Sequence, residues 1–304
     1  MGTPRFAVPS LAALADSENV TLVLCNPDRP AGRGRSVAEP PVKEEAVRRG
    51  IPVFQPEKAR HPEAVARIQA ETPDLIVVVA YGHILPKSIL DIPRLGCINV
   101  HASLLPKYRG AAPINWAVAR GETVTGITIM RMDEGMDTGP MLHVREVPIG
   151  EEDTAETMFS KLSALGADAL QEALRRLRDG TLVGTPQDAS LATYAPMLKK
   201  EHGRIGWNRP AREVRDLVRG MAPWPSAYTL HAGKTLKVLS SAVDGEARPA
   251  GEPGEVVALG RDGIAVACGE GVLRLRVVQP EGGKTMDAWA YAQGRRVAKG
   301  ERLS

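Results

Sequence analysis

Apolar and amphipathic runs alternate over the first 180 residues of the chain. Residues 75–80 form a continuous, valine-rich apolar run, which is typical of a strand buried on both faces. Further strands are predicted at 20–25, 97–101, 125–132 and 141–147, and helices at 42–49, 63–71, 111–120 and 153–178. Strands that alternate with helices predict an α/β layer fold with a mostly parallel sheet.

The pattern changes near residue 190. A helix is predicted at 210–219, and short strands follow at 227–232, 235–239, 255–259, 263–267 and 272–278, separated by turns that contain glycine. Short strands at close spacing indicate a small all-β barrel or sandwich. We therefore divide the 304 residues into domains at 1–190 and 202–304, joined by a linker at 191–201.

The distribution of charge differs between the two parts. The formal net charge is +3, and residues 191–304 carry 18 Lys and Arg against 12 Asp and Glu. A basic C-terminal part indicates an anionic partner, although a solvated surface of mixed charge accounts for the same numbers.

Cysteine and histidine usage points away from metal and disulfide chemistry. The three cysteines include no Cys-x-x-Cys pair, and the six histidines lie far apart without ligand spacing, so we expect neither disulfides nor a metal site. Cys25 and Cys97 lie in apolar runs and are expected in the core. With no secretory signal and no run of membrane-spanning length in view, we expect a cytoplasmic protein that does not enter a membrane.

Two polar residues interrupt the apolar strand at 97–101. Because side chains alternate along a strand, Ile98 and Val100 are expected on one face and Asn99 and His101 on the other. Buried polar groups cost free energy unless they are paired or used, and open α/β sheets bind ligands beyond the carboxyl ends of their strands. Asn99 and His101 are therefore candidate site residues, with a satisfied core histidine beside a capping asparagine as an equal alternative.

A carboxylate follows a later strand. Asp137 lies between Gly135 and Gly139, so we expect a sharp turn that presents its side chain. Alone, this stretch is a plain acidic turn. Together, an amide, an imidazole and a carboxylate are sufficient for acyl-type transfer, because Asn99 and a protonated His101 can hold a developing oxyanion while Asp137 orients the imidazole or relays a proton.

Several spaced blocks resemble the folate-dependent formyltransferases. The blocks are Asn99-x-His101, Ser103-Leu104-Leu105-Pro106, the stretch at 108–113, and Met136-Asp137-Thr138-Gly139. Residues 1–9 and 27–34 look like the members of this family that act on methionyl-tRNA. The resemblance covers nearly the whole chain, including Tyr194-Ala195-Pro196 and Trp224-Pro225.

The resemblance implies a fold and a reaction. It implies a Rossmann-like formyltransferase domain followed by a C-terminal β-barrel of the oligonucleotide-binding (OB) type, with 10-formyltetrahydrofolate as formyl donor and initiator methionyl-tRNA as acceptor. Asn99, His101 and Asp137 match the catalytic residues of the family, and Ser103, Leu104, Leu105 and Pro106 match its folate-contacting segment. We expect a monomer.

Basic residues are candidates for contacts with the acceptor RNA. The loop at 27–41 carries arginines among glycines and prolines, and Arg33 matches the arginine that this loop presents to the tRNA in the family. Lys199 and Lys200 are further candidates, and Arg274, Arg276, Arg295, Arg296 and Lys299 extend a basic track. A solvated surface explains any single one of these residues equally well.

The family normally has a short apolar strand immediately before the block that here begins at Met1. Without that strand, its neighbours would have unpaired backbone groups. We therefore expect an extended upstream reading frame to encode a strand rich in valine, isoleucine or phenylalanine.

Three other functions compete with this hypothesis. A formyltransferase for small amines would lack the basic loop and the basic barrel, and an RNA-binding protein without catalysis would not need Asn99, His101 and Asp137. A nucleotide-dependent oxidoreductase needs a full glycine fingerprint, whereas Gly32-x-Gly34 lacks the third glycine and opens no helix.

Overall fold

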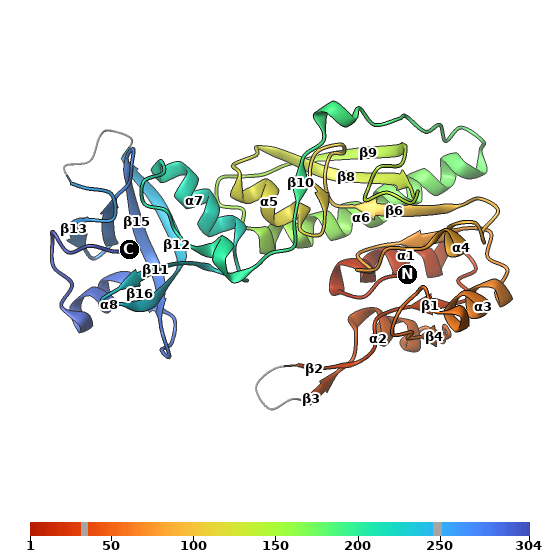
Figure 1. The fold of residues 1–304 in the computed structure, drawn as a ribbon, viewed down its shortest axis with the longest axis horizontal. Coiled ribbons are helices and arrows are strands. Elements are labelled where there is room, and N and C mark those ends of the chain that lie inside the picture. Colours follow the sequence, from red (N-terminus) through yellow and green to blue (C-terminus); the bar gives the residue numbers. More distant parts are fainter. Residues whose placement is uncertain (32–35, 246–250) are drawn as a thin grey trace. The chain divides into compact units, whose positions relative to one another are not determined.

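The structure is a computed structural model that describes residues 1–31, 36–245 and 251–304 (Figure 1). The chain forms two compact units. The first unit consists of residues 1–113, 124–148 and 159–196, and the second of 114–123, 149–158 and 197–304. Cys25 and Cys97 are buried free thiols, as expected for core residues, and Cys268 is a buried free thiol as well. Within the described ranges, every helix falls short of the length and apolar character that a bilayer crossing requires.

A four-stranded sheet forms the centre of the first unit. Its order is β5-β6-β8-β9, with β5 (Ile76–Val78), β6 (Cys97–His101), β8 (Val124–Arg131) and β9 (Met141–Pro148). Strands β5 and β6 are parallel, but β6–β8 and β8–β9 are antiparallel. The prediction of a mostly parallel sheet is therefore wrong for β6, β8 and β9. For β8 and β9 the reason is that only residues 132–140 join them, and a parallel crossover needs a longer connection.

Short strands flank this sheet. β1 (Val23–Leu24) pairs in parallel with β4 (Val53–Phe54), and Met1–Gly2 lies between β1 and β5. The Gly2 amide donates to the Leu24 carbonyl (3.0 Å), and the Val79 amide donates to the Met1 carbonyl (2.8 Å). A cavity of about 630 Å³ lies beside these residues, and residues of β1 and β5 are among those that line it. The remaining short strands are β2 (Arg29–Ala31) with β3 (Ser36–Ala38), and β7 (Arg109–Gly110) with β10 (Tyr194–Ala195).

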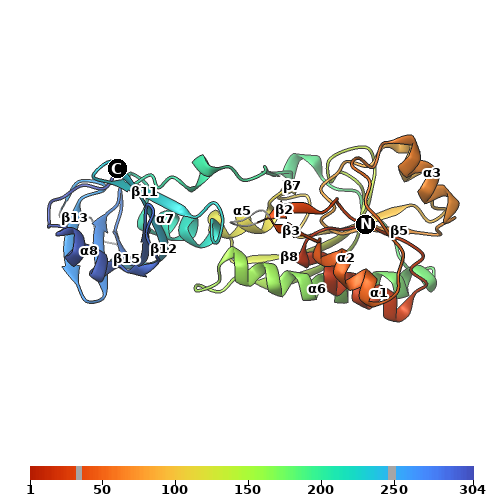
Figure 2. The same ribbon diagram turned by 90° about the horizontal axis from the view of Figure 1, so that it is seen from below.

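Helices pack against the first unit's sheet. They are α1 (Val8–Ser17), α2 (Pro41–Arg48), α3 (Pro62–Ala70), α4 (Lys87–Leu90) and the long α6 (Ala155–Arg178), with 3₁₀ turns η1 (Arg5–Ala7) and η2 (Ala189–Leu191). α2, α3 and α6 match the predicted helices, whereas α1 and α4 were not predicted. α6 lies beside α1 (Figure 2), where the Gln171 side-chain amide donates to the Ala13 carbonyl (2.9 Å). Gly166 of α6 lies against Val100 and Ile127, so the helix covers one face of β6 and β8.

The second unit is an antiparallel sheet with helices. The strand order is β11-β12-β15-β14-β13, and a short strand, β16 (Met286–Asp287), pairs with β15. The strands are β11 (Ala227–His231), β12 (Lys234–Gly245), β13 (Val256–Gly260), β14 (Gly263–Ala267) and β15 (Val272–Pro280). The helices are α5 (Pro113–Ala119), α7 (Ala211–Gly220) and α8 (Ala288–Arg295), with the 3₁₀ turn η3 (Lys200–Gly203). All five predicted C-terminal strands are present, and β12 is longer than predicted.

The last residues of the chain connect the two edge strands of this sheet. Leu230 in β11 exchanges two backbone hydrogen bonds with Ser304 (2.7 and 3.0 Å). On the other side, the Val256 amide donates to the Glu301 carbonyl (2.8 Å), and the Leu303 amide donates to the Gly254 carbonyl (2.8 Å). Residues 300–304 therefore cover backbone groups of both β11 and β13, which would otherwise be open edges.

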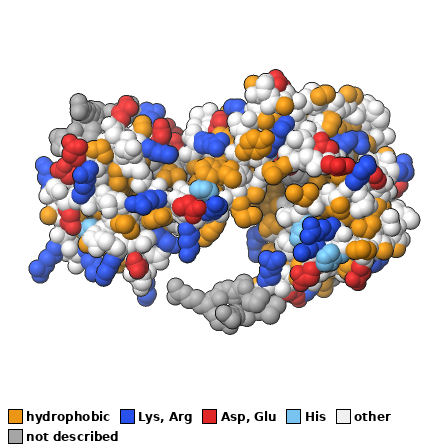
Figure 3. All heavy atoms as spheres, in the orientation of Figure 1, with side chains coloured by type: hydrophobic (Ala, Val, Ile, Leu, Met, Phe, Trp, Pro, Cys, Tyr) orange, Lys and Arg blue, Asp and Glu red, His pale blue; other side chains and the backbone are white. Residues whose placement is uncertain are grey.

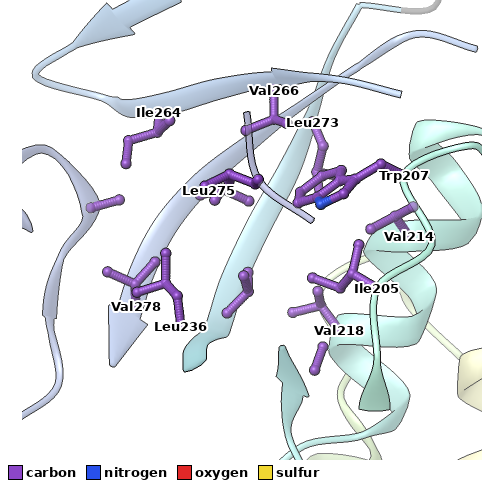
Figure 4. Close-up of a cluster of buried hydrophobic side chains, with 14 of the residues drawn as sticks. Ile205, Trp207, Val214, Val218, Leu236, Ile264, Val266, Leu273, Leu275 and Val278 are labelled. Carbon is purple, nitrogen blue, oxygen red and sulfur yellow. The ribbon is translucent and has the colours of Figure 1, made fainter. Parts of the chain in front are cut away.

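An apolar core fills the second unit (Figure 4). Strand residues such as Leu236, Leu273 and Leu275 pack with Val214 and Val218 from α7. Burying each such side chain stabilises the unit by about 1.5–3 kcal/mol before entropy is counted. Trp207 lies in the same cluster, and its indole nitrogen donates to the Thr229 hydroxyl (3.0 Å), so its one polar group is satisfied.

Candidate active site

β6 places two polar side chains on one face of the first unit's sheet. The strand runs between β5 and β8, with Asn99 opposite Val78 and Met130, and His101 opposite Thr128. Val100 faces α6, whereas Asn99 and His101 both approach the Asp137 carboxylate on the opposite face. The predicted division of the strand is therefore confirmed.

His101 is buried, with 5% of its surface exposed. Its Nε2 lies 3.0 Å from the Tyr108 carbonyl oxygen. A carbonyl only accepts, so Nε2 carries the proton of this hydrogen bond. Nδ1 lies 3.7 Å from Asp137 Oδ2, which is longer than a hydrogen bond. One ring nitrogen is thus fixed by the backbone, and the other faces the carboxylate.

Asp137 lies in the loop between β8 and β9, with a backbone φ of +54°. The expectation that its flanking glycines make the turn is wrong, since Asp137 itself has the left-handed conformation and neither glycine has positive φ. Gly139 serves close packing instead, because a Cβ there would lie 1.9 Å from the Arg131 carbonyl oxygen. The Gly110 amide donates to Asp137 Oδ2 (2.8 Å) and fixes the carboxylate.

The three candidate side chains meet at this carboxylate. Asn99 Nδ2 donates to Asp137 Oδ1 over 3.4 Å, while His101 Nδ1 approaches Oδ2. Asp137 keeps 17% of its side chain exposed, so the cluster reaches solvent. An amide donor, an imidazole and a carboxylate at this spacing can hold an oxyanion and move a proton.

The segment 103–106 is a tight, internally bonded turn directly after β6. Ser103 is fully buried, and its hydroxyl donates to the Lys107 carbonyl (2.7 Å). Thr128 of β8 fixes the turn, because its hydroxyl donates to the Ser103 carbonyl (2.7 Å) and accepts from the Leu105 amide (3.2 Å). Leu105 is buried as well, whereas Leu104 and Pro106 are partly exposed.

Sequence reasoning gave no role to Thr128, Arg109 or Gln187. Gln187 reaches the Asp137 loop from a segment about fifty residues later, donating to the Asp137 and Gly139 carbonyls (2.9 and 2.7 Å). No local pattern at Gln187 signals this contact. Arg109 belongs to one of the family-like blocks, which was the only available signal for it.

The basic candidates differ in solvent exposure and in ion pairing. Arg33 lies outside the described residues. Lys199 and Lys200, in the second unit, are both exposed, and Lys199 Nζ lies 3.6 Å from Glu201. Arg274 is ion-paired with Asp244 and Asp262, so its charge is already compensated. Figure 3 shows Lys and Arg side chains interspersed with acidic and apolar ones on the face in view.

The chain resembles known proteins over most of its length. The model of the formyl transferase family matches residues 1–174, and that of the formyl transferase C-terminal domain matches residues 197–296. The chain is 53% identical to the methionyl-tRNA formyltransferase of Geobacter metallireducens over 100% of this chain and 97% of that one. It is 49% identical to the methionyl-tRNA formyltransferase of Acetivibrio thermocellus, over 100% and 98%.

Solved structures share the fold at lower identity. An N-formyltransferase from Helicobacter canadensis, in complex with folinic acid and dTDP-3-aminofucose, superimposes with a TM-score of 0.68 at 17% identity, covering 90% of this chain and 96% of that one. HypX from Aquifex aeolicus in complex with tetrahydrofolic acid superimposes with a TM-score of 0.59 at 20% identity, covering 84% and 45%. The first unit thus has the expected Rossmann-like formyltransferase fold, and the chain belongs to the methionyl-tRNA formyltransferases of the formyl transferase family.

Proposed function

We propose that the chain transfers the formyl group of 10-formyltetrahydrofolate to the α-amine of initiator methionyl-tRNA, giving N-formylmethionyl-tRNA for translation initiation. Asn99, His101 and Asp137 are the proposed catalytic residues. The observation that supports this most directly is the approach of Asn99 Nδ2 and His101 Nδ1 to the two oxygens of one carboxylate.

The proposed reaction passes through a tetrahedral intermediate. The neutral amine attacks the formyl carbon, a new C–N bond forms, and the formyl oxygen becomes an oxyanion. Asn99 and protonated His101 donate hydrogen bonds to this oxygen. Asp137 supports the imidazole and takes the proton that the amine nitrogen loses. When the oxyanion collapses, the bond from carbon to N10 of the folate breaks, and N10 takes up the proton that Asp137 received, so the protons balance.

We assign the folate to the turn at 103–106. Ser103 contributes through the shape of the turn rather than its hydroxyl, since that hydroxyl already bonds to Lys107. The partly exposed Leu104 and Pro106 offer apolar surface, and buried Leu105 anchors the turn. The bonds to Thr128 hold this segment beside His101 before the folate arrives.

We assign tRNA binding to Arg33, Lys199, Lys200 and the second unit. We also propose that the second unit is a barrel of the OB type, closed by the tail at 300–304, because this tail bonds to both edge strands. The proposed domain boundaries remain 1–190 and 202–304 with a linker at 191–201, and the protein acts as a cytoplasmic monomer.

An acceptor comparison tests this function. Labelled formyl transfer from 10-formyltetrahydrofolate is measured onto charged initiator tRNA, uncharged tRNA, free methionine and an amino-sugar nucleotide. Rapid transfer is expected only with the charged tRNA, because the α-amine and the RNA are recognised together. A comparable rate onto the amino sugar would contradict the proposed acceptor, and no transfer to any amine would contradict the enzymatic assignment.

A further inference from the structure

The segment at residues 181–196 forms hydrogen bonds to both loops of the site, at 102–112 after β6 and at 132–140 between β8 and β9. This segment lies between the two regions that match family models, because the first match ends at residue 174 and the second begins at residue 197. Thr185 exchanges two backbone hydrogen bonds with Met141, at 2.8 and 2.9 Å. The Thr193 hydroxyl accepts from the Tyr108 amide (2.9 Å), and the Ala195 carbonyl accepts from the Ala111 amide (2.9 Å).

Gln187 is the member of this segment that reaches the backbone of the proposed catalytic carboxylate. Its Nε2 donates to the carbonyls of Asp137 (2.9 Å) and Gly139 (2.7 Å). One amide group therefore uses both of its N–H donors on the same loop. These two bonds fix the orientation of the peptide groups that join Asp137 to Thr138 and Gly139 to Pro140.

Arg109 determines which way this amide points. The Nε and Nη2 atoms of Arg109 lie 3.1 and 2.7 Å from Gln187 Oε1. Arg109 is only 5% exposed, and its guanidinium can only donate, so the amide oxygen faces Arg109 and the NH₂ faces the loop. A glutamate at position 187 would pair with Arg109 but would have no donor for the two carbonyls.

The Asp137 backbone requires such support. A non-glycine residue at a φ of +54° is strained by about 1–3 kcal/mol and persists only when its surroundings hold it. Relaxation to negative φ would turn the carboxylate away from the Gly110 amide and from His101. The Gly110 amide holds the carboxylate from the side-chain end, and Gln187 holds the loop from the backbone end.

From these contacts we infer that Gln187, oriented by Arg109, is a positioning residue that keeps the Asp137 carboxylate against Asn99 and His101. The inference rests on the proposed catalytic role of Asp137. It assigns a function to a segment that connects the matched regions of the chain, and it predicts a loss of turnover rather than of substrate binding.

Four variants test this inference: Gln187→Ala, Gln187→Glu, Asp137→Asn and the double variant Asp137→Asn/Gln187→Ala. Ser190→Ala is the matched control, because the Ser190 hydroxyl donates to Asp188 within the same segment and, among the described residues, has no bond to the Asp137 loop. For each purified full chain, kcat and both KM values are measured in the formyl-transfer assay, and Tm is measured to confirm folding.

Gln187→Ala is expected to lower kcat on the order of 100-fold, as small misplacements of a catalytic group do, with both KM values and the Ser190→Ala control unchanged. Gln187→Glu is expected to lose as much kcat while keeping its Tm, because its carboxylate satisfies Arg109 but cannot hold the loop. In the Asp137→Asn background, Gln187→Ala is expected to have no further effect, since it acts only through Asp137.

Three results would overturn the inference: wild-type kcat in Gln187→Ala, wild-type kcat in Gln187→Glu, or an equal loss from Gln187→Ala in both backgrounds. The last result would make Gln187 a structural residue. Failure of the proposed function looks different, because Asp137→Asn alone would then turn over at the wild-type rate.

Discussion

Two buried histidines, one in each unit, have similar positions in their strands and different environments. His101 is the last residue of β6 and His231 the last residue of β11, and they are 5% and 6% exposed. Both ring nitrogens of His231 are within hydrogen-bond distance of a side chain, Nδ1 at 2.6 Å from the Tyr291 hydroxyl and Nε2 at 2.7 Å from Glu301. In His101, Nε2 forms one hydrogen bond, to the backbone carbonyl of Tyr108, whereas Nδ1 lies 3.7 Å from the Asp137 carboxylate.

This difference is what we expect between a structural histidine and the proposed catalytic one. A side chain with two short partners stabilises a fold, and any substrate would have to displace one of those partners at a cost. A ring fixed at one nitrogen has the second available for a reacting group. His231 holds the tail at 300–304 to β11, whereas His101 is oriented by Tyr108 toward the position that Asn99 and Asp137 also face.

The largest expected effect is on His101. His101→Ala should lower the rate of formyl transfer by about a hundredfold or more, because it removes a donor to the oxyanion. The Tm should fall by only a few degrees, since the main loss is one hydrogen bond to a buried carbonyl, that of Tyr108. Steady-state kinetics with charged initiator tRNA and a thermal melt measure the two quantities, and unimpaired turnover would refute the role of His101.

His231 should give the reverse result. His231→Leu leaves the buried Tyr291 hydroxyl without its partner, at a cost of about 1–3 kcal/mol. It also removes a bond from the Glu301 carboxylate, which is 37% exposed and can turn to solvent, so that loss costs less. Tryptophan fluorescence reports on the second unit alone, because Trp116, Trp207, Trp224 and Trp289 all lie there. Urea unfolding should shift to lower midpoint while kcat at a permissive temperature is preserved. A large loss of kcat with unchanged stability would contradict the purely structural role of His231.

The sequence alone does not distinguish these histidines, because each follows an aliphatic residue at the end of a strand, as in Val100-His101 and Leu230-His231. Side-chain alternation is a local property of a strand, so it predicted the faces of β6 correctly. Whether both ring nitrogens find hydrogen-bond partners depends on residues far along the chain. Tyr291 and Glu301 are 60 and 70 residues from His231.

The same limit applies to the proposed site. The family-like blocks led to Asn99, His101 and Asp137, and the structure brings these three side chains together. No pattern in the sequence indicates that Asp137 itself has positive φ, or that Gln187 holds its loop from 50 residues away. Loop geometry and long-range contacts of this kind are set by tertiary packing, which local periodicity does not encode.

The smallest expected effect concerns the carboxylate beside His231. The pKa of Glu301 lies below its ordinary value of 4.5, first because the Ala298 amide donates to it and then because His231 does. Since this pKa is lower in the folded chain than in the unfolded one, the stabilisation is complete above the unfolded-state pKa and is lost as the pH falls through the folded-state pKa. The carboxylate is 37% exposed, so solvent screens the effect to within about 1 kcal/mol at neutral pH.

Glu301→Gln should therefore lower the urea midpoint of the second unit slightly at pH 7 and by less as the pH falls, measured by tryptophan fluorescence. The urea midpoints of the two proteins should converge as the pH falls through the folded-state pKa of Glu301. The wild-type carboxyl group is then protonated and, like the amide of the variant, uncharged. A constant difference between the midpoints at every pH would mean that Glu301 acts by shape rather than charge. His231 would in that case hold the tail through a neutral hydrogen bond, and the contrast with His101 would rest on the number of its partners alone.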